Sequence, residues 1–237
     1  MPTKEEIRAR RRKKKQQQRL TIIMVVAGVA LIALAIIMLP AIQRSMTPVG
    51  DFTVPEQNPR PMADGNAMGD PNAPVTIIEF SDFGCGHCAA FAQDAGERIT
   101  EDYIANGKVY FVSRSVGGLL RNPLTQRAAE AAYCAADQNK YWEYHDIIYA
   151  NQSILFYGGL SDIDNYLKAF AETLQLDPDQ FDECLKSGQH KAQLQEDEHD
   201  ANAAGINGTP SFLINGEVFH GNMPYNGFQE AIESHLP

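Results

Sequence analysis

The stretch Cys85-Gly86-His87-Cys88 decides the fold and the chemistry of this chain. It follows an apolar, β-branched run at 75–80 that is typical of a buried strand, and it precedes an Ala-rich run from Ala89 onward that is typical of a helix. Two cysteines three residues apart at the start of a helix lie on one face of its first turn, close enough to form a disulfide. In this setting the motif predicts a redox-active pair.

The position of Cys85 at the start of the predicted helix favours its thiolate. Unpaired backbone N–H groups and the positive end of the helix dipole lie there, and both stabilise a negative charge. His87 lies between the two cysteines and adds to this stabilisation when it is protonated. The thiolate, and not the thiol, is the species that attacks in disulfide exchange.

Charge is distributed unevenly along the 237 residues, which carry a formal net charge of −10. Residues 1–39 hold nine Lys and Arg against two acidic residues, so the rest of the chain holds 11 basic and 28 acidic residues, a net charge of −17. Such a surface repels phosphate. The composition therefore excludes nucleic acid as a partner of the main domain.

Residues 20–39 form an uncharged apolar segment between a basic tail and Pro40. A helix of about 20 residues spans about 30 Å, the thickness of a bilayer core, so the segment is predicted to cross the cell membrane. The basic residues of 1–19 indicate a cytoplasmic N-terminus and an extracytoplasmic C-terminal part. The alternative is a cleaved signal peptide, but its apolar core usually has only about 7–15 residues. We expect a single-pass protein with an uncleaved signal anchor.

Residues 40–65 are predicted to be a flexible linker, because prolines and small polar residues favour extended backbone. The ordered domain is expected at 66–237. A second strand at 108–114 follows the predicted helix at 85–106, and the resulting β-α-β unit requires the two strands to be parallel. Helical composition prevails over about 120–204. A hairpin that turns at Asn215-Gly216 and a last helix follow.

This order of elements resembles the DsbA-like thiol:disulfide oxidoreductases, and most closely their membrane-anchored homologues in Gram-positive and related bacteria. The resemblance extends from about residue 70 to the C-terminus and is carried by four blocks: 79–88, 130–138, 141–145 and 205–212. It implies an α/β chain with a thioredoxin fold and an inserted all-helical subdomain, preceded here by the transmembrane helix.

The resemblance also assigns roles to individual residues. It makes Cys85 the exposed nucleophile and Cys88 the buried resolving cysteine. It makes Pro210 a cis-proline that faces the disulfide, with Thr209 offering backbone hydrogen bonds to a bound substrate chain. Glu79, six residues before Cys85, matches the buried acid that accepts or relays the proton of Cys88.

The dipeptide between the cysteines departs from the best-known DsbA pattern. Here it is Gly86-His87, as in protein disulfide isomerases, rather than Pro-His. The reduction potential is roughly −180 mV for disulfide isomerase and −120 mV for DsbA, against −270 mV for thioredoxin. We expect the potential of the Cys85–Cys88 pair to lie nearer the first two values. We expect an oxidase that donates disulfides to reduced secreted or envelope proteins. A reductase or isomerase of the same compartment remains the alternative.

The resemblance implies a partner as well as substrates. The pair must be reoxidised, and the related enzymes use a quinone-linked membrane protein of the DsbB or VKOR type. No cofactor is expected in the chain itself. Since no dimerisation domain of the DsbC type precedes the catalytic domain, we expect a monomer.

Cys134 and Cys184 lie in the predicted helical insertion, and two interpretations apply to them. They are either two buried thiols that pack as small apolar groups or a structural disulfide. An even cysteine count in an extracytoplasmic domain favours the disulfide. Related anchored homologues place a structural bond at matching positions.

A metal-binding protein is the remote alternative, since Cys85, His87 and Cys88 are possible soft-metal ligands. A structural zinc site, however, needs four ligands, commonly from a second C-x-x-C or H-x-x-x-H segment, and the sequence contains none. We therefore expect no metal. The remaining histidines, including His145, are interpreted as packing or surface residues.

Overall fold

The computed structural model describes residues 49–117 and 122–237, together with residues 15, 17, 19–29, 31–34 and 36. The chain divides into two compact units, Met1–Pro48 and Val49–Pro237. The predicted anchor at 20–39 and the basic tail at 1–19 lie partly outside the described residues, and those of 20–39 that are described are helical. Among the described residues, no helix combines the length and the apolar character that crossing a membrane requires.

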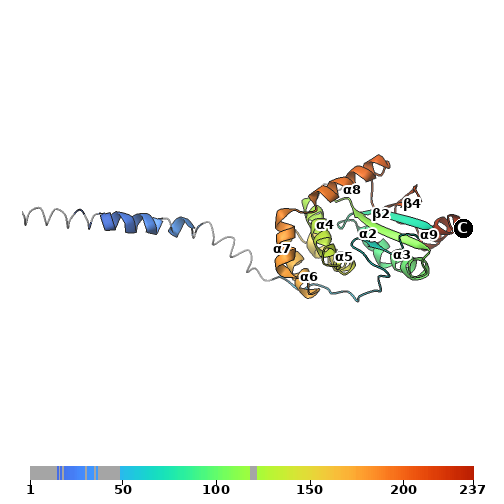
Figure 1. The fold of residues 1–237 in the computed structure, drawn as a ribbon, viewed down its shortest axis with the longest axis horizontal. Coiled ribbons are helices and arrows are strands. Elements are labelled where there is room, and N and C mark those ends of the chain that lie inside the picture. Colours follow the sequence, from blue (N-terminus) through green and yellow to red (C-terminus); the bar gives the residue numbers. More distant parts are fainter. Residues whose placement is uncertain are drawn as a thin grey trace, which may run out of the picture. The chain divides into compact units, whose positions relative to one another are not determined.

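The second unit is built on a five-stranded sheet with the strand order β1-β3-β2-β4-β5 (Figure 1). At its centre, β2 (Val75–Ser81) and β3 (Val109–Ser115) are parallel, which confirms the predicted β-α-β unit. The predicted hairpin is formed by β4 (Ser211–Ile214) and β5 (Glu217–His220), and β4 pairs antiparallel with β2. The short edge strand β1 (Ala67–Met68) was not predicted and pairs antiparallel with β3.

The predicted helix over 85–106 is divided in the structure. It consists of α2 (Gly86–Gln93), α3 (Ala95–Ile99) and a π-helical turn, η1 (Thr100–Ile104). The break lies at Asp94, whose backbone angles are not helical (φ −132°, ψ −87°). Asp and the nearby Gly96 are weak helix formers, so the amphipathic pattern predicted the helical surface correctly but not its continuity.

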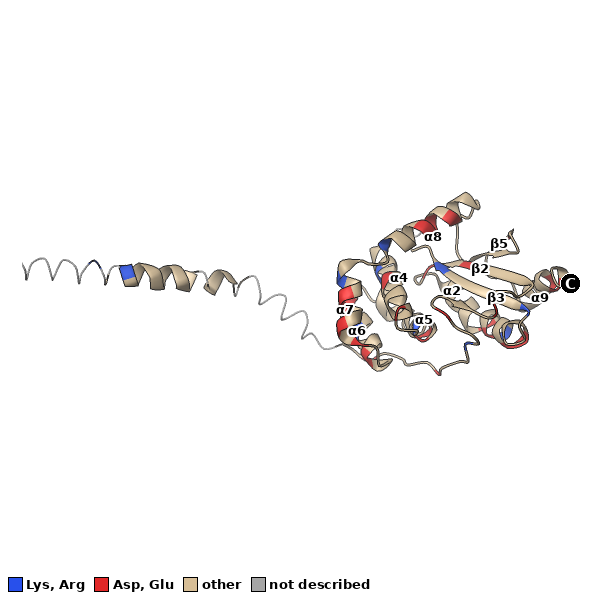
Figure 2. Cartoon of the chain, viewed as in Figure 1, with Lys and Arg blue, Asp and Glu red and all other residues tan. Residues whose placement is uncertain are grey.

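The predicted helical insertion lies between β3 and β4, and Figure 1 shows its helices gathered beside the sheet. Asn122 and Asp177 cap two of these helices through side-chain oxygens, each followed by a proline in the first turn. The elements are α4 (Pro123–Ala136), α5 (Tyr141–Ala150), η2 (Ser153–Tyr157), α6 (Asp164–Thr173), α7 (Pro178–Ser187) and α8 (Lys191–Ala203). Acidic residues occur along α6, α7 and α8 (Figure 2).

The two faces of the sheet bury different cores. Residues of β2 alternate between them, so that Ile77 and Glu79 share one face while Phe80 lies on the other. The first face packs against α2 and the last helix, α9 (Tyr225–Ser234), and the second against a small cluster that includes Ala201 of α8. Glu79 is therefore placed inside the larger core.

Residues 49–65, part of the predicted linker, belong to the compact unit. The ring of Phe52 packs on that of Phe170 with 5.0 Å between centroids. The N–H of Thr53 donates to the side chain of Asn151 at 2.8 Å, and Arg60 forms an ion pair of 2.6 Å with Asp146. Composition predicted the extended backbone, but it carries no information on the surface against which such a segment packs.

Candidate active site

The turn between β2 and α2 presents Cys85 as the N-cap residue of α2. Asp82 fixes this turn, because its carboxylate accepts the N–H of Gly84 at 2.7 Å and its carbonyl accepts the N–H of Cys85 at 2.9 Å. A side chain at Gly84 would place its Cβ only 2.6 Å from Thr125, so glycine is required there. Gly86, in contrast, has open space around its Cα.

Cys85 is partly exposed and its surroundings favour the thiolate. Hydrogen bonds from the Cys88 thiol, from Thr209 and from the backbone N–H groups of Cys88 and His87 lower the pKa of Cys85 to about 5, although burial opposes them. The imidazole of His87 is exposed, and His87 acts on the sulfur through its backbone. The expected stabilisation at the helix N-terminus is present.

Cys88 has the opposite environment. Its side chain is buried, and burial, the hydrogen bond to Cys85 and the carboxyl group of Glu79 hold the pKa of Cys88 well above that of an ordinary thiol. Glu79 is itself buried, which raises the pKa of Glu79 to about 8. At neutral pH this acid therefore keeps its proton beside the cysteine that must gain or lose one.

Thr209 and Pro210 lie directly across from Cys85. The peptide bond between them is cis, and the thiol of Cys85 lies 3.4 Å from the carbonyl oxygen of Thr209. Asn207 and Gly208, the residues just before them, are exposed. The structure thus brings together all the residues that the resemblance assigned to the site, next to an exposed stretch of backbone.

Two residues of the helical insertion hold the same turn and had no signal in the sequence. The side-chain amide of Gln152 donates to the carbonyl groups of Phe83 at 2.7 Å and of Cys85 at 3.0 Å. The hydroxyl of Tyr157 donates to the carbonyl of Gly84 at 2.5 Å. No spacing rule relates these residues to a turn about 70 positions earlier in the chain.

Asp82 is a further titratable group that sequence reasoning did not single out. It is fully buried, and burial raises the pKa of Asp82 to about 7 against the opposing hydrogen bonds from Gly84 and Thr125. In the sequence Asp82 stands between Ser81 and Phe83, which gives no pattern from which its burial could be inferred. The hydrogen bonds of its carboxylate with Gly84 and Thr125 give it a positioning role in the turn.

Cys134 and Cys184 form a disulfide that joins α4 to α7, with 5.8 Å between their Cα atoms. Both residues are buried. Within the described part of the chain, the one cluster of potential metal ligands consists of these two cysteines and His190, and it includes neither Cys85 nor Cys88.

Comparisons with known proteins agree with this geometry. A thioredoxin family model matches residues 62–234. The probable disulfide bond formation protein D of Bacillus cereus is 31% identical over 72% of this chain and 78% of its own length. The Na⁺/H⁺ antiporter NhaA 1 of Salinispora arenicola is 34% identical over 71% of this chain, which spans only 24% of that relative's length.

Solved structures give the same result. The crystal structure of α-DsbA1 from Wolbachia pipientis superposes with a TM-score of 0.64 at 25% identity, covering 74% of this chain and 92% of the other. The residues matched by the family model include both cysteine pairs. The chain therefore belongs to the thioredoxin family, and within it is similar to the DsbA-like disulfide oxidoreductases.

Proposed function

We propose that this chain is an extracytoplasmic disulfide oxidase that donates the Cys85–Cys88 disulfide to reduced secreted or envelope proteins. The observation that carries the proposal is the contrast between the two sulfurs, a partly exposed Cys85 with a low pKa and a buried Cys88 with a high one. A low pKa makes Cys85 a good leaving group, which favours the reduced enzyme and hence transfer of the disulfide to the substrate.

The reaction proceeds by two exchange steps. A substrate thiolate attacks Cys85 Sγ, the bond to Cys88 breaks, and Cys88 leaves with the electron pair and takes a proton from Glu79. A second substrate thiolate then attacks the substrate sulfur of the mixed disulfide, and Cys85 leaves as a thiolate. Two electrons pass from the substrate to the enzyme.

The exposed backbone at 207–209 supplies the surface against which the substrate chain lies during attack. Backbone N–H and C=O groups of this stretch offer sequence-independent hydrogen bonds, which suits an enzyme that acts on many unfolded chains. Within this stretch, the carbonyl oxygen of Thr209 lies 3.4 Å from the reacting sulfur.

The environment of the enzyme is part of the proposal. The basic residues of 1–19 and the apolar segment at 20–39 support a single-pass anchor that holds the catalytic domain outside the membrane. There a quinone-linked partner of the DsbB or VKOR type returns the pair to the disulfide, and the enzyme works as a monomer.

An isomerase is the second candidate, and the dipeptide Gly86-His87 is the observation that favours it. An isomerase acts through the same Cys85 but starts from the dithiol. A substrate that holds non-native disulfides separates the two activities, because only an isomerase rearranges it without an added oxidant.

The test is oxidation of a reduced, unfolded two-cysteine substrate by the purified full chain, with Cys85→Ser and Cys88→Ser variants. Cys85→Ser is expected to be inactive. Cys88→Ser has no disulfide of its own to donate, so it is tested with oxidised glutathione as the two-electron oxidant, and it is expected to accumulate a mixed disulfide through Cys85. Cys134→Ser/Cys184→Ser is the matched control and should still oxidise the substrate. Full activity of either active-site variant would contradict the proposal.

A further inference from the structure

A small cavity adjoins Glu79. Its polar lining consists of Arg60, Glu79 and His145, and the rest of its wall is apolar. The cavity volume is about 10 Å³. This is about the space that one buried water molecule needs, and three polar side chains are enough partners to hold it.

Arg60 supplies an independent sign that this cavity is occupied. Its Nε is buried and has no hydrogen-bond partner among the described residues. The other end of the same guanidinium binds Asp146 at 2.6 Å and lies over the ring of Trp142. A buried N–H group without a partner is rare and unfavourable, and a water molecule in the adjoining cavity provides the missing acceptor.

His145 connects the cavity to Asp146. The imidazole is buried, which lowers the pKa of His145 and leaves the ring neutral near pH 7. Its Nδ1 lies 2.8 Å from Oδ1 of Asp146, so a neutral ring that donates there has Nε2 free to act as an acceptor. A neutral imidazole of this kind accepts a proton at one nitrogen and releases one from the other.

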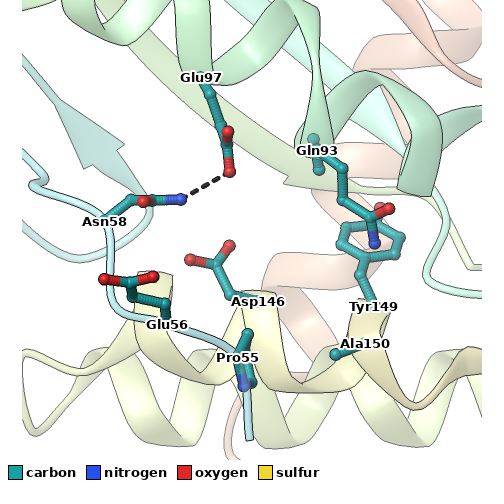
Figure 3. A pocket seen from close by; sticks show the side chains of 9 residues that line it. Pro55, Glu56, Asn58, Gln93, Glu97, Asp146, Tyr149 and Ala150 are labelled. Atoms are coloured by element: carbon teal, nitrogen blue, oxygen red, sulfur yellow. Dashed lines mark hydrogen bonds between the residues drawn. The ribbon is translucent and has the colours of Figure 1, made fainter. Parts of the chain in front are cut away.

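Asp146 in turn lines a larger cavity of about 350 Å³ at the surface of the domain. Figure 3 shows its carboxylate pointing into this space, between Glu56 and Tyr149 and below Glu97. Glu56 and Asn58, which also line it, are exposed. The side chain of Asp146 is 17% exposed, whereas Glu79 is 3% exposed, so Asp146 is the more accessible of the two carboxyl groups to solvent.

We propose that a water molecule bound by Arg60 Nε links Glu79 to His145, and that this water and the His145–Asp146 pair carry protons between Glu79 and solvent. The inference rests on the proposed function, because it concerns the proton that Cys88 exchanges during thiol–disulfide exchange. It makes His145 a proton-relay residue rather than a packing residue, and it gives a segment of the predicted linker a part in the site.

The proton steps balance without any further reactant. When Cys88 gives up its proton during reoxidation, Glu79 takes it and passes its own proton to the water. The water protonates Nε2 of His145, and the proton on Nδ1 leaves to Asp146 and then to solvent. The reverse sequence resupplies Glu79 when Cys88 is released as a thiolate, and only O–H, N–H and S–H bonds change.

Other titratable groups that face His145 do not offer a competing route. Tyr141 and Tyr149 pack against the imidazole from the same helix, with ring centroids 6.0 and 4.7 Å away. Burial raises the pKa of both tyrosines above their ordinary value, so neither loses its proton near neutral pH. The guanidinium of Arg60 is a hydrogen-bond donor only and offers no acceptor for a proton.

The test compares His145→Gln with the unaltered full chain in steady-state oxidation of a two-cysteine peptide, with oxidised glutathione as the terminal oxidant. Glutamine keeps a hydrogen-bonding side chain but does not relay a proton. We expect the rate to fall at least about tenfold at low buffer concentration and to recover as imidazole buffer is added at constant pH and ionic strength. His199→Gln, an exposed histidine on α8, is the matched control and should behave like the unaltered chain.

Buffer rescue separates a relay from a packing effect, since a loosened core slows the enzyme at every buffer concentration. A rate for His145→Gln that equals that of the unaltered chain, or a loss that imidazole does not restore, would overturn the relay. If the unaltered chain oxidised no thiols, the proposed function would fail instead. Alkylation of Cys85 by iodoacetamide should be equally fast in all three chains.

A second measurement needs no variant and applies even where His145→Gln does not fold. A high-resolution crystal structure of the chain should show an ordered water within hydrogen-bond distance of Arg60 Nε and of Glu79 or His145. An empty cavity, or a water that contacts only one of these groups, would contradict the inference.

Discussion

The two cysteine pairs of this domain differ in whether their sulfur atoms are bonded and in the residues that surround them. Cys85 and Cys88 are free thiols at a helix N-terminus, one partly exposed and one buried. Cys134 and Cys184 are bonded to each other, are both buried, and lie 50 residues apart in sequence. Whether a cysteine pair exchanges its disulfide or keeps it is therefore decided by the environment of the sulfur atoms.

Loop length adds to this difference. A disulfide between residues three apart removes little freedom from the unfolded chain, whereas one that closes a 50-residue loop removes much. Donors directed at Cys85 stabilise its thiolate, but no such donor is needed where a bond is to persist. The first pair is therefore arranged for reactivity and the second for stability.

The largest expected effect is on stability, and it tests the second pair. Cys134→Ala/Cys184→Ala should lower the free energy of unfolding by about 4 kcal/mol, because the unfolded chain regains the freedom of the loop. The reactivity of Cys85 should stay unchanged. Denaturant unfolding of the full chain measures the first quantity and alkylation kinetics the second; a stability equal to that of the unaltered chain would show that the bond has no structural role.

The pH dependence of Cys85 alkylation tests the reactivity of the first pair. Since hydrogen bonds lower the pKa of Cys85 to about 5, the rate of alkylation should rise with a midpoint near pH 5 and reach a plateau by neutral pH. An ordinary thiol with a pKa of about 8.5 would still be mostly protonated there. A midpoint near 8.5 would remove the proposed basis for the oxidising character.

Glu79 is expected to make stability depend on pH, with a definite sign. Burial raises the pKa of Glu79 to about 8 from an ordinary value of 4.5, so the folded chain holds this proton more tightly than the unfolded chain. Its contribution to stability is fully present below about pH 4.5 and is lost as the pH rises through about 8. In the oxidised chain, Glu79→Gln should flatten this part of the stability profile.

The matched control for Glu79→Gln is Glu172→Gln, an exposed residue of α6. It should leave the profile unchanged, and thermal melting across the pH range distinguishes the two variants. An unchanged profile for Glu79→Gln would mean that Glu79 titrates in the folded chain as it does in the unfolded one.

The smallest effect concerns the helical insertion. Tyr157→Phe removes the hydrogen bond to the carbonyl of Gly84 but keeps the ring, and should cost about 1 kcal/mol or less of stability. Gln152→Ala removes two such bonds to the same turn and should cost more. Denaturant unfolding of the two variants measures these losses in the free energy of unfolding. If both variants were as stable as the unaltered chain, the insertion would not fix the turn.

The sequence predicted those parts of the site that local patterns describe. The strand that ends at Ser81, the cysteines at the start of α2 and the β4–β5 hairpin all follow from apolar runs, turn residues and spacing. The cis peptide before Pro210 was implied by resemblance and is present. These features depend on residues that are close together in the sequence, and a sequence pattern describes such residues.

The features that the sequence missed depend on contacts between distant segments. Arg60 lies in a proline-rich stretch whose composition predicts extended backbone, yet it reaches Asp146, 86 residues away. Gln152 and Tyr157 bind the active-site turn from the helical insertion, about 70 residues later in the chain. Burial of His145 likewise arises from aromatic rings that only the folded chain assembles around it.

The equilibrium reduction potential of the Cys85–Cys88 pair, measured in the full chain against glutathione, tests the central claim most directly. Because the surroundings favour the Cys85 thiolate, the account predicts a value near or above roughly −180 mV, in the range of disulfide donors. A value close to thioredoxin, near roughly −270 mV, would contradict it and identify the chain as a reductase.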